Sequence, residues 1–396
     1  MFKRFLQLDT ILKRKSLFLF GPRQTGKSTY LKTIFPEALN INLLKSTEYR
    51  ELLNNPENLN AKIIFYLKQN SKNNLVIIDE VQKIPELLDT VHDLIEANKN
   101  LRFILTGSST RKLKRVSANM LGGRAALVHM FPITAHELKT DAQNKKTWTD
   151  FLTIGSLPSV LNSEFPFEDL SDYISAYLKN EIEEEGLSRS IGNFSRFLNF
   201  SALRIGEQLN FTSLASDAQI SPILVKEYFQ ILSDTLIGHL VEPFNHTKKR
   251  KAMMTSKFYF FDMGLANALV KRASVPAFSN EYGILLENFI HNEMKAYLSY
   301  TRSKKEIQFW RSTSKLEVDF IIWDNQNYKT ITAVEVKSTV QPNKKHLSGL
   351  NALSEEFSSI KKYLVCQCTS PMEIGEGVQA LPVELFLNKL WNSKII

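Results

Sequence analysis

Short apolar runs alternate with helical segments along the first third of the chain. The apolar runs lie near residues 17–20, 39–43, 75–78, 102–106 and 126–130. The run at 75–78 is continuously apolar, which is typical of a strand buried on both faces of a parallel sheet. Strands that alternate with helices predict a parallel, doubly wound sheet. We therefore expect an α/β domain over residues 1–135.

The pattern turns helical after Pro132 and changes twice more. Residues 136–207 form a helical region, and apolar residues recur on one helical face within 169–186. Residues 208–275 predict two helices followed by two strands around a basic loop. Residues 276–396 predict a long helix and then a second α/β domain.

Composition limits the choice of partner and compartment. The 396 residues carry 50 Lys and Arg against 41 Asp and Glu, a net charge of +9 that favours a polyanionic partner such as nucleic acid. Cys366 and Cys368, the two cysteines, cannot build a disulfide framework or a four-ligand metal site. No stretch approaches the roughly 18 apolar residues of a membrane span. We expect a cytoplasmic protein without a membrane partner.

The first predicted strand leads into GPRQTGKST, residues 21–29. The spacing G-x-x-x-x-G-K-[ST] between a strand and a helix predicts a phosphate-binding loop for ATP. Backbone N–H groups would surround the phosphates, Lys27 would reach the β- and γ-phosphates, and Ser28 would hold Mg²⁺. The predicted ATP contacts in this loop are Gly21, Pro22, Arg23, Gln24, Thr25, Gly26, Lys27, Ser28 and Thr29.

Acidic and hydroxyl side chains follow two later strands. Asp79 and Glu80 directly follow the apolar run at residues 75–78. This places them at the carboxyl edge of the sheet, where open α/β sheets bind ligands. We expect Asp79 to act through the Mg²⁺ shell and Glu80 to orient or deprotonate the attacking water. Ser108, with Thr106 and Ser109, either senses the γ-phosphate or belongs to an ordinary polar loop.

Arg124 follows two glycines and precedes another apolar strand. An arginine in this place predicts neutralisation of transition-state charge, in its own subunit or in a neighbouring subunit of an oligomer. The alternative is an arginine at the surface or one paired with a carboxylate.

The segments GPRQTGKST, VIIDEVQKIP, FILTGSS and LGGRAALVHMFPIT together resemble the bacterial and archaeal AAA+-type ATPases that are related to the signal-transduction NTPases. The resemblance implies that Lys27, Asp79 and Glu80 form the ATP site. It includes the turn GSLP, which that family places after the ATPase domain, and departs slightly at Gly122.

Residues 208–275 carry the plan of a winged helix, in which a helix reads a groove and a hairpin touches phosphates. Ser221 and Pro222 predict the start of the second helix. The hairpin loop would contact DNA through Lys248, Lys249, Arg250 and Lys251. The alternatives are a protein contact or a solvated basic loop.

Three charges lie within two apolar strands of the last region. Asp319 belongs to the first strand, and Glu335 and Lys337 share one face of the second, roughly 6.6 Å apart along it. A polar loop over 323–330 would join adjacent strands and bring the two carboxylates together. The alternative is an ordinary Glu335–Lys337 ion pair.

In the helix predicted over 281–300, Glu287 lies on the apolar face. A carboxylate in that place needs a partner or a metal ion. With Asp319 and Glu335 it would offer oxygen ligands for Mg²⁺, and Lys337 would stabilise a developing oxyanion. This constellation resembles the restriction-endonuclease-like PD-(D/E)xK fold. The resemblance matches Glu287 to the helix acid, Asp319 to the strand acid and Glu335-Val336-Lys337 to the E-x-K motif.

Two functions follow from these patterns. The first is a Mg²⁺-dependent ATP hydrolase that acts on DNA and carries a catalytic nuclease-like module. The second is a nucleotide-controlled switch in which the nuclease-like fold docks without cleaving, because a fold does not by itself determine a function.

Overall fold

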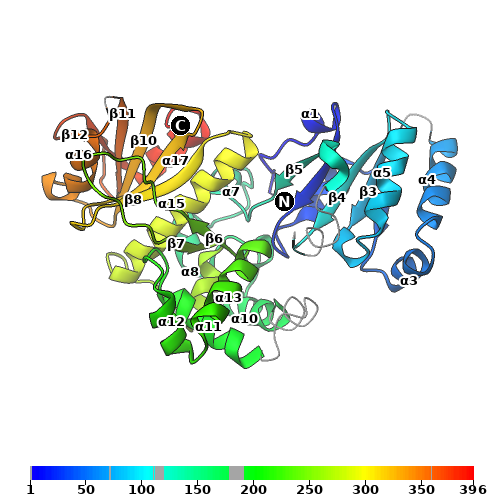
Figure 1. Cartoon of the computed structure of the whole chain (residues 1–396), viewed down its shortest axis with the longest axis horizontal. Helices are drawn as coiled ribbons and strands as arrows, with labels where there is room; N and C mark the ends of the chain where they lie inside the picture. Colours follow the sequence, from blue (N-terminus) through cyan, green and yellow to red (C-terminus); the bar gives the residue numbers. More distant parts are fainter. Residues whose placement is uncertain (1, 71–72, 110, 112–119, 178–190, 358) are drawn as a thin grey trace. The chain divides into compact units, whose positions relative to one another are not determined.

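The structure is a computed structural model that describes residues 2–70, 73–109, 111, 120–177, 191–357 and 359–396 (Figure 1). The chain divides into two compact units. Arg4–Pro132 and Asp234–Leu236 form the N-terminal unit, and Ile133–Ser233, Ile237–Ile396 and the residues before Arg4 form the C-terminal unit. The predicted middle regions and the last domain therefore share one unit.

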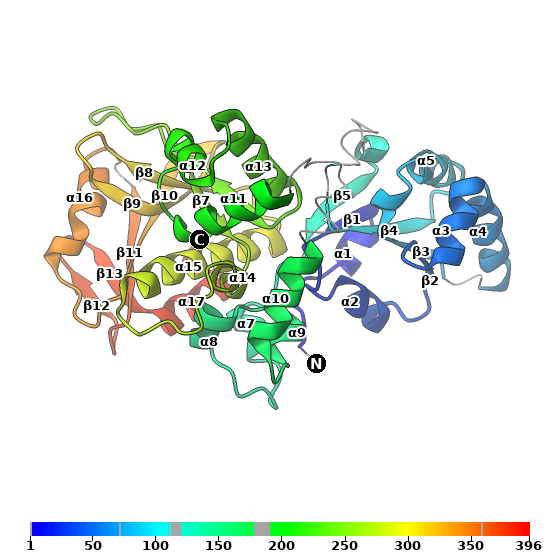
Figure 2. The same ribbon diagram turned by 90° about the horizontal axis from the view of Figure 1, so that it is seen from below.

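A five-stranded parallel sheet forms the centre of the N-terminal unit. Its strands are β1 (Ser16–Phe20), β2 (Leu39–Asn42), β3 (Leu75–Asp79), β4 (Arg102–Gly107) and β5 (Ala125–His129). They lie in the order β2-β3-β4-β1-β5, which can be followed in Figure 2, and every neighbouring pair is parallel. The predicted parallel sheet is confirmed.

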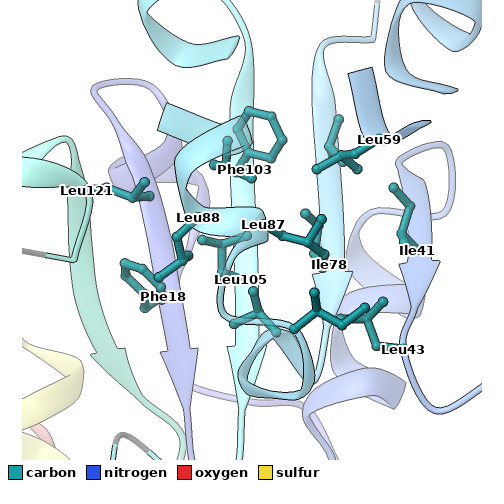
Figure 3. Close-up of a cluster of buried hydrophobic side chains, with 14 of the residues drawn as sticks. Phe18, Ile41, Leu43, Leu59, Ile78, Leu87, Leu88, Phe103, Leu105 and Leu121 are labelled. Carbon is teal, nitrogen blue, oxygen red and sulfur yellow. The ribbon is translucent and has the colours of Figure 1, made fainter. Parts of the chain in front are cut away.

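Helices cover this sheet and close its core. They are α1 (Asp9–Leu12), α2 (Lys27–Ile34), α3 (Ser46–Asn54), α4 (Asn58–Gln69) and α5 (Leu87–Ala97). Side chains from alternate strand positions, such as Phe18 and Ile78, pack against Leu59 of α4 and Leu87 and Leu88 of α5 (Figure 3). Burial of each such side chain contributes about 1.5–3 kcal/mol. The core thus fixes the strand ends that carry the polar residues.

A six-stranded mixed sheet dominates the C-terminal unit. Its strands are β8 (Glu306–Arg311), β9 (Glu317–Asp324), β10 (Asn327–Lys337), β11 (Ile360–Cys366), β12 (Met372–Ile374) and β13 (Val378–Pro382). Their order is β12-β13-β11-β10-β9-β8, with β10–β11 and β11–β13 parallel and the other pairs antiparallel. The predicted loop over 323–330 is wrong in extent, because Asn327 already pairs with Asp324 and continues the strand.

The C-terminal unit also contains helices, of which the longest and the last two contact the sheet. They are α7 (Ala135–Leu138), α8 (Trp148–Ile154), α9 (Pro158–Leu161), α10 (Pro166–Tyr177), α11 (Ile191–Leu203), α12 (Phe211–Ala218), α13 (Pro222–Asp234), α14 (Met263–Leu269), α15 (Asn280–Tyr300), α16 (Ser348–Ser354) and α17 (Val383–Trp391). The amphipathic segment predicted over 169–186 is helical to Tyr177, and its remainder lies outside the described residues. In Figure 2, α11, α12 and α13 form one group, and α15 lies along the sheet.

The strands β6 (Gly238–Val241) and β7 (Lys257–Phe260) form an antiparallel pair after α13, as the sequence predicts. The segment between them is joined to the edge strand β8. The Phe244 amide donates to the Phe309 carbonyl at 2.7 Å, and the Met253 amide donates to the Arg311 carbonyl at 2.8 Å. The Phe244 side chain lies in the core of the six-stranded sheet. The hairpin loop is therefore not a free wing.

Glu293 connects three helices inside the C-terminal unit. Its carboxylate accepts hydrogen bonds from the Ala135 amide of α7 at 2.7 Å and from Nε1 of Trp391 of α17 at 2.8 Å. Burial raises the pKa of Glu293 to about 7, although these hydrogen bonds oppose the shift. The folded unit thus holds Glu293 protonated at pH values where the unfolded chain ionises it.

This shift predicts that the C-terminal unit loses stability as pH rises. The contribution of Glu293 is fully present below its unfolded pKa near 4.5 and is lost as pH rises through 7, a change of about 3 kcal/mol. Glu293→Gln should flatten the pH dependence between pH 4.5 and 7.5, measured by urea unfolding. All four tryptophans, Trp148, Trp310, Trp323 and Trp391, lie in the C-terminal unit, so their fluorescence reports its unfolding.

Glu384→Gln, at an exposed position of α17, is the matched control and should keep the wild-type slope. An equal slope in the wild type and Glu293→Gln would show that Glu293 ionises normally in the folded unit.

Candidate functional site

The loop between β1 and α2 has the backbone that phosphate binding requires. Gly26 has a φ of 90° and caps α2, a conformation that residues with a side chain rarely adopt. Gly21 packs directly on the Met130 carbonyl, where a Cβ atom would clash. The first N–H groups of α2 therefore lie at the end of this loop and form a site for an anion.

Lys27 begins α2 and is only 6% exposed. Its ammonium donates to the carbonyls of Gly21 at 2.6 Å and Pro22 at 3.0 Å, both in the loop itself. The cation is thus held at the centre of the loop. The predicted contacts Arg23, Gln24, Thr25 and Thr29 lie in the same loop and the first turn of α2, and Gly26 joins the two.

Asp79, at the carboxyl end of β3, meets Ser28. The Ser28 hydroxyl donates to Oδ2 of Asp79 at 2.8 Å, and the Thr106 hydroxyl donates to Oδ1. Asp79 is 3% exposed. A hydroxyl and a carboxylate in contact beside a phosphate-binding loop are oxygen ligands of the kind that Mg²⁺ binds together with phosphates, so the residues present fit this ion.

Glu80 lies in a strained backbone position at the edge of the sheet. Its φ of 62° places it in the left-handed region, and its amide donates to the Thr106 hydroxyl at 3.1 Å. Gln82 Nε2 donates to Glu80 at 2.6 Å and to the Ser108 hydroxyl at 3.3 Å. Gln82 is not among the residues predicted from the sequence, although it lies two residues after the acidic pair. It joins Glu80 to Ser108.

Arg124 contacts a different carboxylate. Its Nε donates to Glu96 of α5, and the side chain of Arg124 is 37% exposed. The hydrogen bonds from Arg124 and Lys99 lower the pKa of Glu96 to about 2. In the structure Arg124 is therefore paired with a carboxylate, and a catalytic role for this arginine stays a prediction.

A second cluster of charges lines a cavity of about 490 Å³ in the C-terminal unit. The four residues predicted from the sequence line it together: Glu287 from α15, Asp319 from β9, and Glu335 and Lys337 from β10. The cavity also contains charged residues that the sequence analysis did not select, namely Glu207, Lys257, Arg311 and Glu317.

Adjacent strands hold Asp319 and Glu335 together. Strands β9 and β10 are antiparallel and Phe320 lies opposite Val334. One position further along, Asp319 therefore lies opposite Glu335. The Val336 amide donates to Asp319 at 2.8 Å, and the Asp319 amide donates to Glu335 at 3.3 Å. Lys337 Nζ lies 2.5 Å from Glu335 Oε1 and 3.6 Å from Asp319 Oδ2.

Glu287 belongs to a separate ion-pair network. Its Oε1 accepts from Lys257 Nζ at 3.1 Å and from the Tyr259 hydroxyl at 2.5 Å. Lys257 Nζ also lies 2.6 Å from Glu317, which pairs with Arg311 at 3.3 Å. Lys257 and Tyr259 are two residues apart in β7 and therefore lie on the same face of that strand. This spacing was the signal in the sequence that could have indicated that both contact one partner.

Burial changes the proton affinities of this cluster. It raises the pKa of Glu335 to about 8, and repulsion from Asp319 adds to this effect while Lys337 opposes it. Burial also raises the pKa of Glu287, against the attraction of Lys257. The two carboxylates are thus placed where added positive charge stabilises their ionised forms.

In the described part of the chain, no group of three or more His, Cys, Asp or Glu side chains is arranged to hold a metal ion. The three predicted ligands line one cavity, but Glu287 is engaged by Lys257. Asp319 and Glu335 form a two-carboxylate pair, and Mg²⁺ commonly uses one or two protein carboxylates with water. The pair therefore fits a divalent ion, whereas a three-carboxylate arrangement is not formed.

The basic loop packs against the end of α16. The amides of Lys248 and Arg250 donate to Glu356 at 2.8 and 3.1 Å, and the Lys249 amide also donates to it. The Arg250 guanidinium pairs with Glu355 at 2.8 Å. Of the four basic residues of the loop, Lys248, Lys249 and Lys251 are exposed.

The fold and the site of the N-terminal unit define an AAA-type nucleotide-binding domain, and comparison supports this class. Residues 13–139 match the family model of an AAA domain. Residues 145–275 and 282–386 match two domains of unknown function, DUF8612 and DUF4143. The AAA match supports ATP binding and ATPase activity.

The chain is also similar to three uncharacterized proteins. Those from Mycobacterium bovis and Mycobacterium tuberculosis are each 22% identical over 312 residues, which cover 77% of this chain and 67% of theirs. One from Haemophilus influenzae is 20% identical over 298 residues, which cover 72% of this chain and 70% of its own. Among the described helices, none has the length and apolar composition needed to cross a membrane.

Proposed function

We propose that this protein is a Mg²⁺-dependent ATPase that acts on DNA. The observation that carries the ATPase part is the contact between Ser28 and Asp79, 2.8 Å long, beside the buried Lys27. Two segments far apart in the sequence, the start of α2 and the end of β3, thus place an ammonium, a hydroxyl and a carboxylate at one edge of a parallel sheet, where such sheets bind nucleotides.

Each group at this edge has a role in the proposed reaction. Phosphate oxygens would replace the loop carbonyls that now accept from Lys27. Ser28 and Asp79 would hold Mg²⁺, which supplies charge neutralisation on the phosphates. Glu80 would orient the attacking water and take its proton, while Gln82 fixes the Glu80 carboxylate against Ser108.

We assign the C-terminal unit to DNA contact. The helices α12 and α13 followed by β6 and β7 have the order of a winged helix, and the cavity of Asp319, Glu335 and Lys337 resembles a PD-(D/E)xK site. A site of paired carboxylates and lysine suits a divalent ion and a phosphodiester. The net charge of +9 supports a polyanionic partner.

The exposed lysines of the basic loop supply one test of DNA contact. Lys248→Glu with Lys249→Glu should weaken binding to a fluorescent duplex at least tenfold and make its salt dependence less steep, because phosphate contacts are lost. The backbone hydrogen bonds to Glu356 do not depend on these side chains, so the loop should keep its structure. Lys304→Glu with Lys394→Glu, at exposed positions, is the charge-matched control. Equal affinity and salt slope in both double variants would remove this loop from the interface.

Plasmid cleavage separates a catalytic role of the C-terminal cavity from docking. Wild-type protein with Mg²⁺ or Mn²⁺ should nick supercoiled plasmid, and Asp319→Asn should not. The engagement of Glu287 by Lys257 favours the second candidate, a docking module. Intact plasmid with retained DNA binding would assign that role.

A further inference from the structure

Lys257 brings a positive charge into the C-terminal cavity from outside the six-stranded sheet. It belongs to β7, which pairs with β6, and its side chain is 3% exposed. The ammonium lies 3.1 Å from Glu287, 2.6 Å from Glu317 and 5.3 Å from the centroid of the Phe309 ring. An apolar ring on one side and two carboxylates on another fix its position.

This lysine keeps its charge. Burial alone would lower the pKa of Lys257, but the negative charges of Glu287, Asp319 and Glu317 outweigh burial and raise the pKa above its usual value. A buried charge without partners costs several kcal/mol, so the lysine and its carboxylates stabilise the folded cavity only together. Lys257 thus performs for Glu287 and Glu317 what a bound cation would do.

The charges that line the cavity do not balance. Five acidic residues and three basic residues line it, which leaves two negative charges in excess when all are ionised. One divalent cation would neutralise this excess, and a second would exceed it. Asp319 and Glu335 are outside the ion pairs of Lys257 and lie side by side on neighbouring strands.

We propose that the Lys257 ammonium occupies the place of one cation in this cavity, so that the cavity accepts a single divalent ion, bound by Asp319 and Glu335. The proposal deepens the proposed function, since it rests on a divalent-ion site in the C-terminal unit. According to this proposal, Lys257 determines how many divalent ions bind in the cavity.

Binding of Mn²⁺ to the full-length protein without nucleotide tests this assignment. All proteins carry Asp79→Asn, so that the N-terminal unit does not contribute, and free Mn²⁺ is measured by electron paramagnetic resonance. The parent should bind one Mn²⁺, and Asp319→Asn should abolish it. Lys257→Met should bind a second Mn²⁺ or bind the first at least tenfold more tightly. Lys257→Arg, which keeps the cation, and Lys304→Met, at an exposed lysine, should match the parent.

A charge-balanced variant guards against a failure to fold. Lys257→Met takes the ion-pair partner from Glu287 and leaves Glu317 with Arg311, whereas Lys257→Met with Glu317→Gln removes one charge of each sign. Tryptophan emission and thermal melting establish that each variant is folded. In the double variant Glu287 is released from its ion pair while the excess of negative charge stays at two, so this variant should bind the single Mn²⁺ at least tenfold more tightly than the parent.

The outcomes separate the two claims. The assignment of Lys257 is overturned if the parent binds one Asp319-dependent Mn²⁺ while both folded Lys257→Met variants bind it identically or lose it. The divalent-ion site itself fails, and the assignment with it, if neither the parent nor any Lys257→Met variant binds Asp319-dependent Mn²⁺. If the Lys257→Met variants bind Mn²⁺ and the parent does not, Lys257 is the cation of the native cavity. That result would contradict a divalent ion in the native cavity.

Discussion

Replacing Lys27 by alanine should lower the rate of ATP hydrolysis at least 100-fold. The Lys27 ammonium is held at the centre of the phosphate-binding loop by two carbonyls, 2.6 and 3.0 Å away, and no other lysine lies in that loop. A 100-fold loss corresponds to about 2.7 kcal/mol of transition-state stabilisation, as expected for a charge on the transferred phosphate. Phosphate release at saturating ATP and Mg²⁺ measures it.

Lys32→Ala on the same helix is the matched control. Lys32 is exposed and lies one turn further along α2, so this variant should hydrolyse ATP at the wild-type rate. Both variants should melt like the wild type without nucleotide. Hydrolysis by Lys27→Ala at more than a third of the wild-type rate would remove this lysine from the reaction.

Replacing Glu80 by glutamine should stop hydrolysis while leaving ATP bound. Glu80 follows β3, outside the phosphate-binding loop, and its side chain accepts a hydrogen bond from Gln82 at 2.6 Å, which the side-chain oxygen of a glutamine would also accept. Loss of a general base lowers rates by about 10²–10⁴-fold. We therefore expect a kcat at least 100-fold below that of the wild type, with the Kd for fluorescent ATP within threefold.

Glu86→Gln serves as the control for this variant, because Glu86 is exposed at the start of α5. It should leave both kcat and Kd unchanged. If Glu80→Gln weakened ATP binding as much as hydrolysis, Glu80 would act in holding the nucleotide and not in activating water.

Local patterns predicted the parts of the sites that depend on one strand or one loop. The phosphate-binding loop follows from four residue types at fixed spacing, and alternation along β10 placed Glu335 and Lys337 on one face, where they lie 2.5 Å apart. The adjacency of Asp319 and Glu335 needed only two neighbouring strands. These features depend on the two-residue alternation of side chains along a strand, which can be read directly from a sequence.

Contacts between segments distant in the sequence were not predictable. Lys257 reaches Glu287 and Glu317 only because β7 packs beside a sheet to which it does not belong. Arg124 meets Glu96 because the turn that precedes it, Met120–Gly123, contacts α5. Each of these pairs is a product of tertiary packing, and neither partner carries a local signal for the other.

The basic loop illustrates a third limit. Its sequence predicts an exposed wing, and three of its lysines are exposed, but its backbone is tied to β8 and to Glu356. The amide groups that make these hydrogen bonds are present in every residue, so composition could not indicate where the loop docks.

If the chain is a Mg²⁺-dependent ATPase that acts on DNA, as we propose, then DNA should raise its rate of ATP hydrolysis. Phosphate release by the purified wild-type chain, with Mg²⁺ and ATP across a titration of duplex DNA, tests it most directly. We expect a Mg²⁺-dependent rate that rises at least threefold to a plateau as DNA is added. A chain that releases no phosphate, or releases it at one rate whatever the DNA concentration, would contradict it.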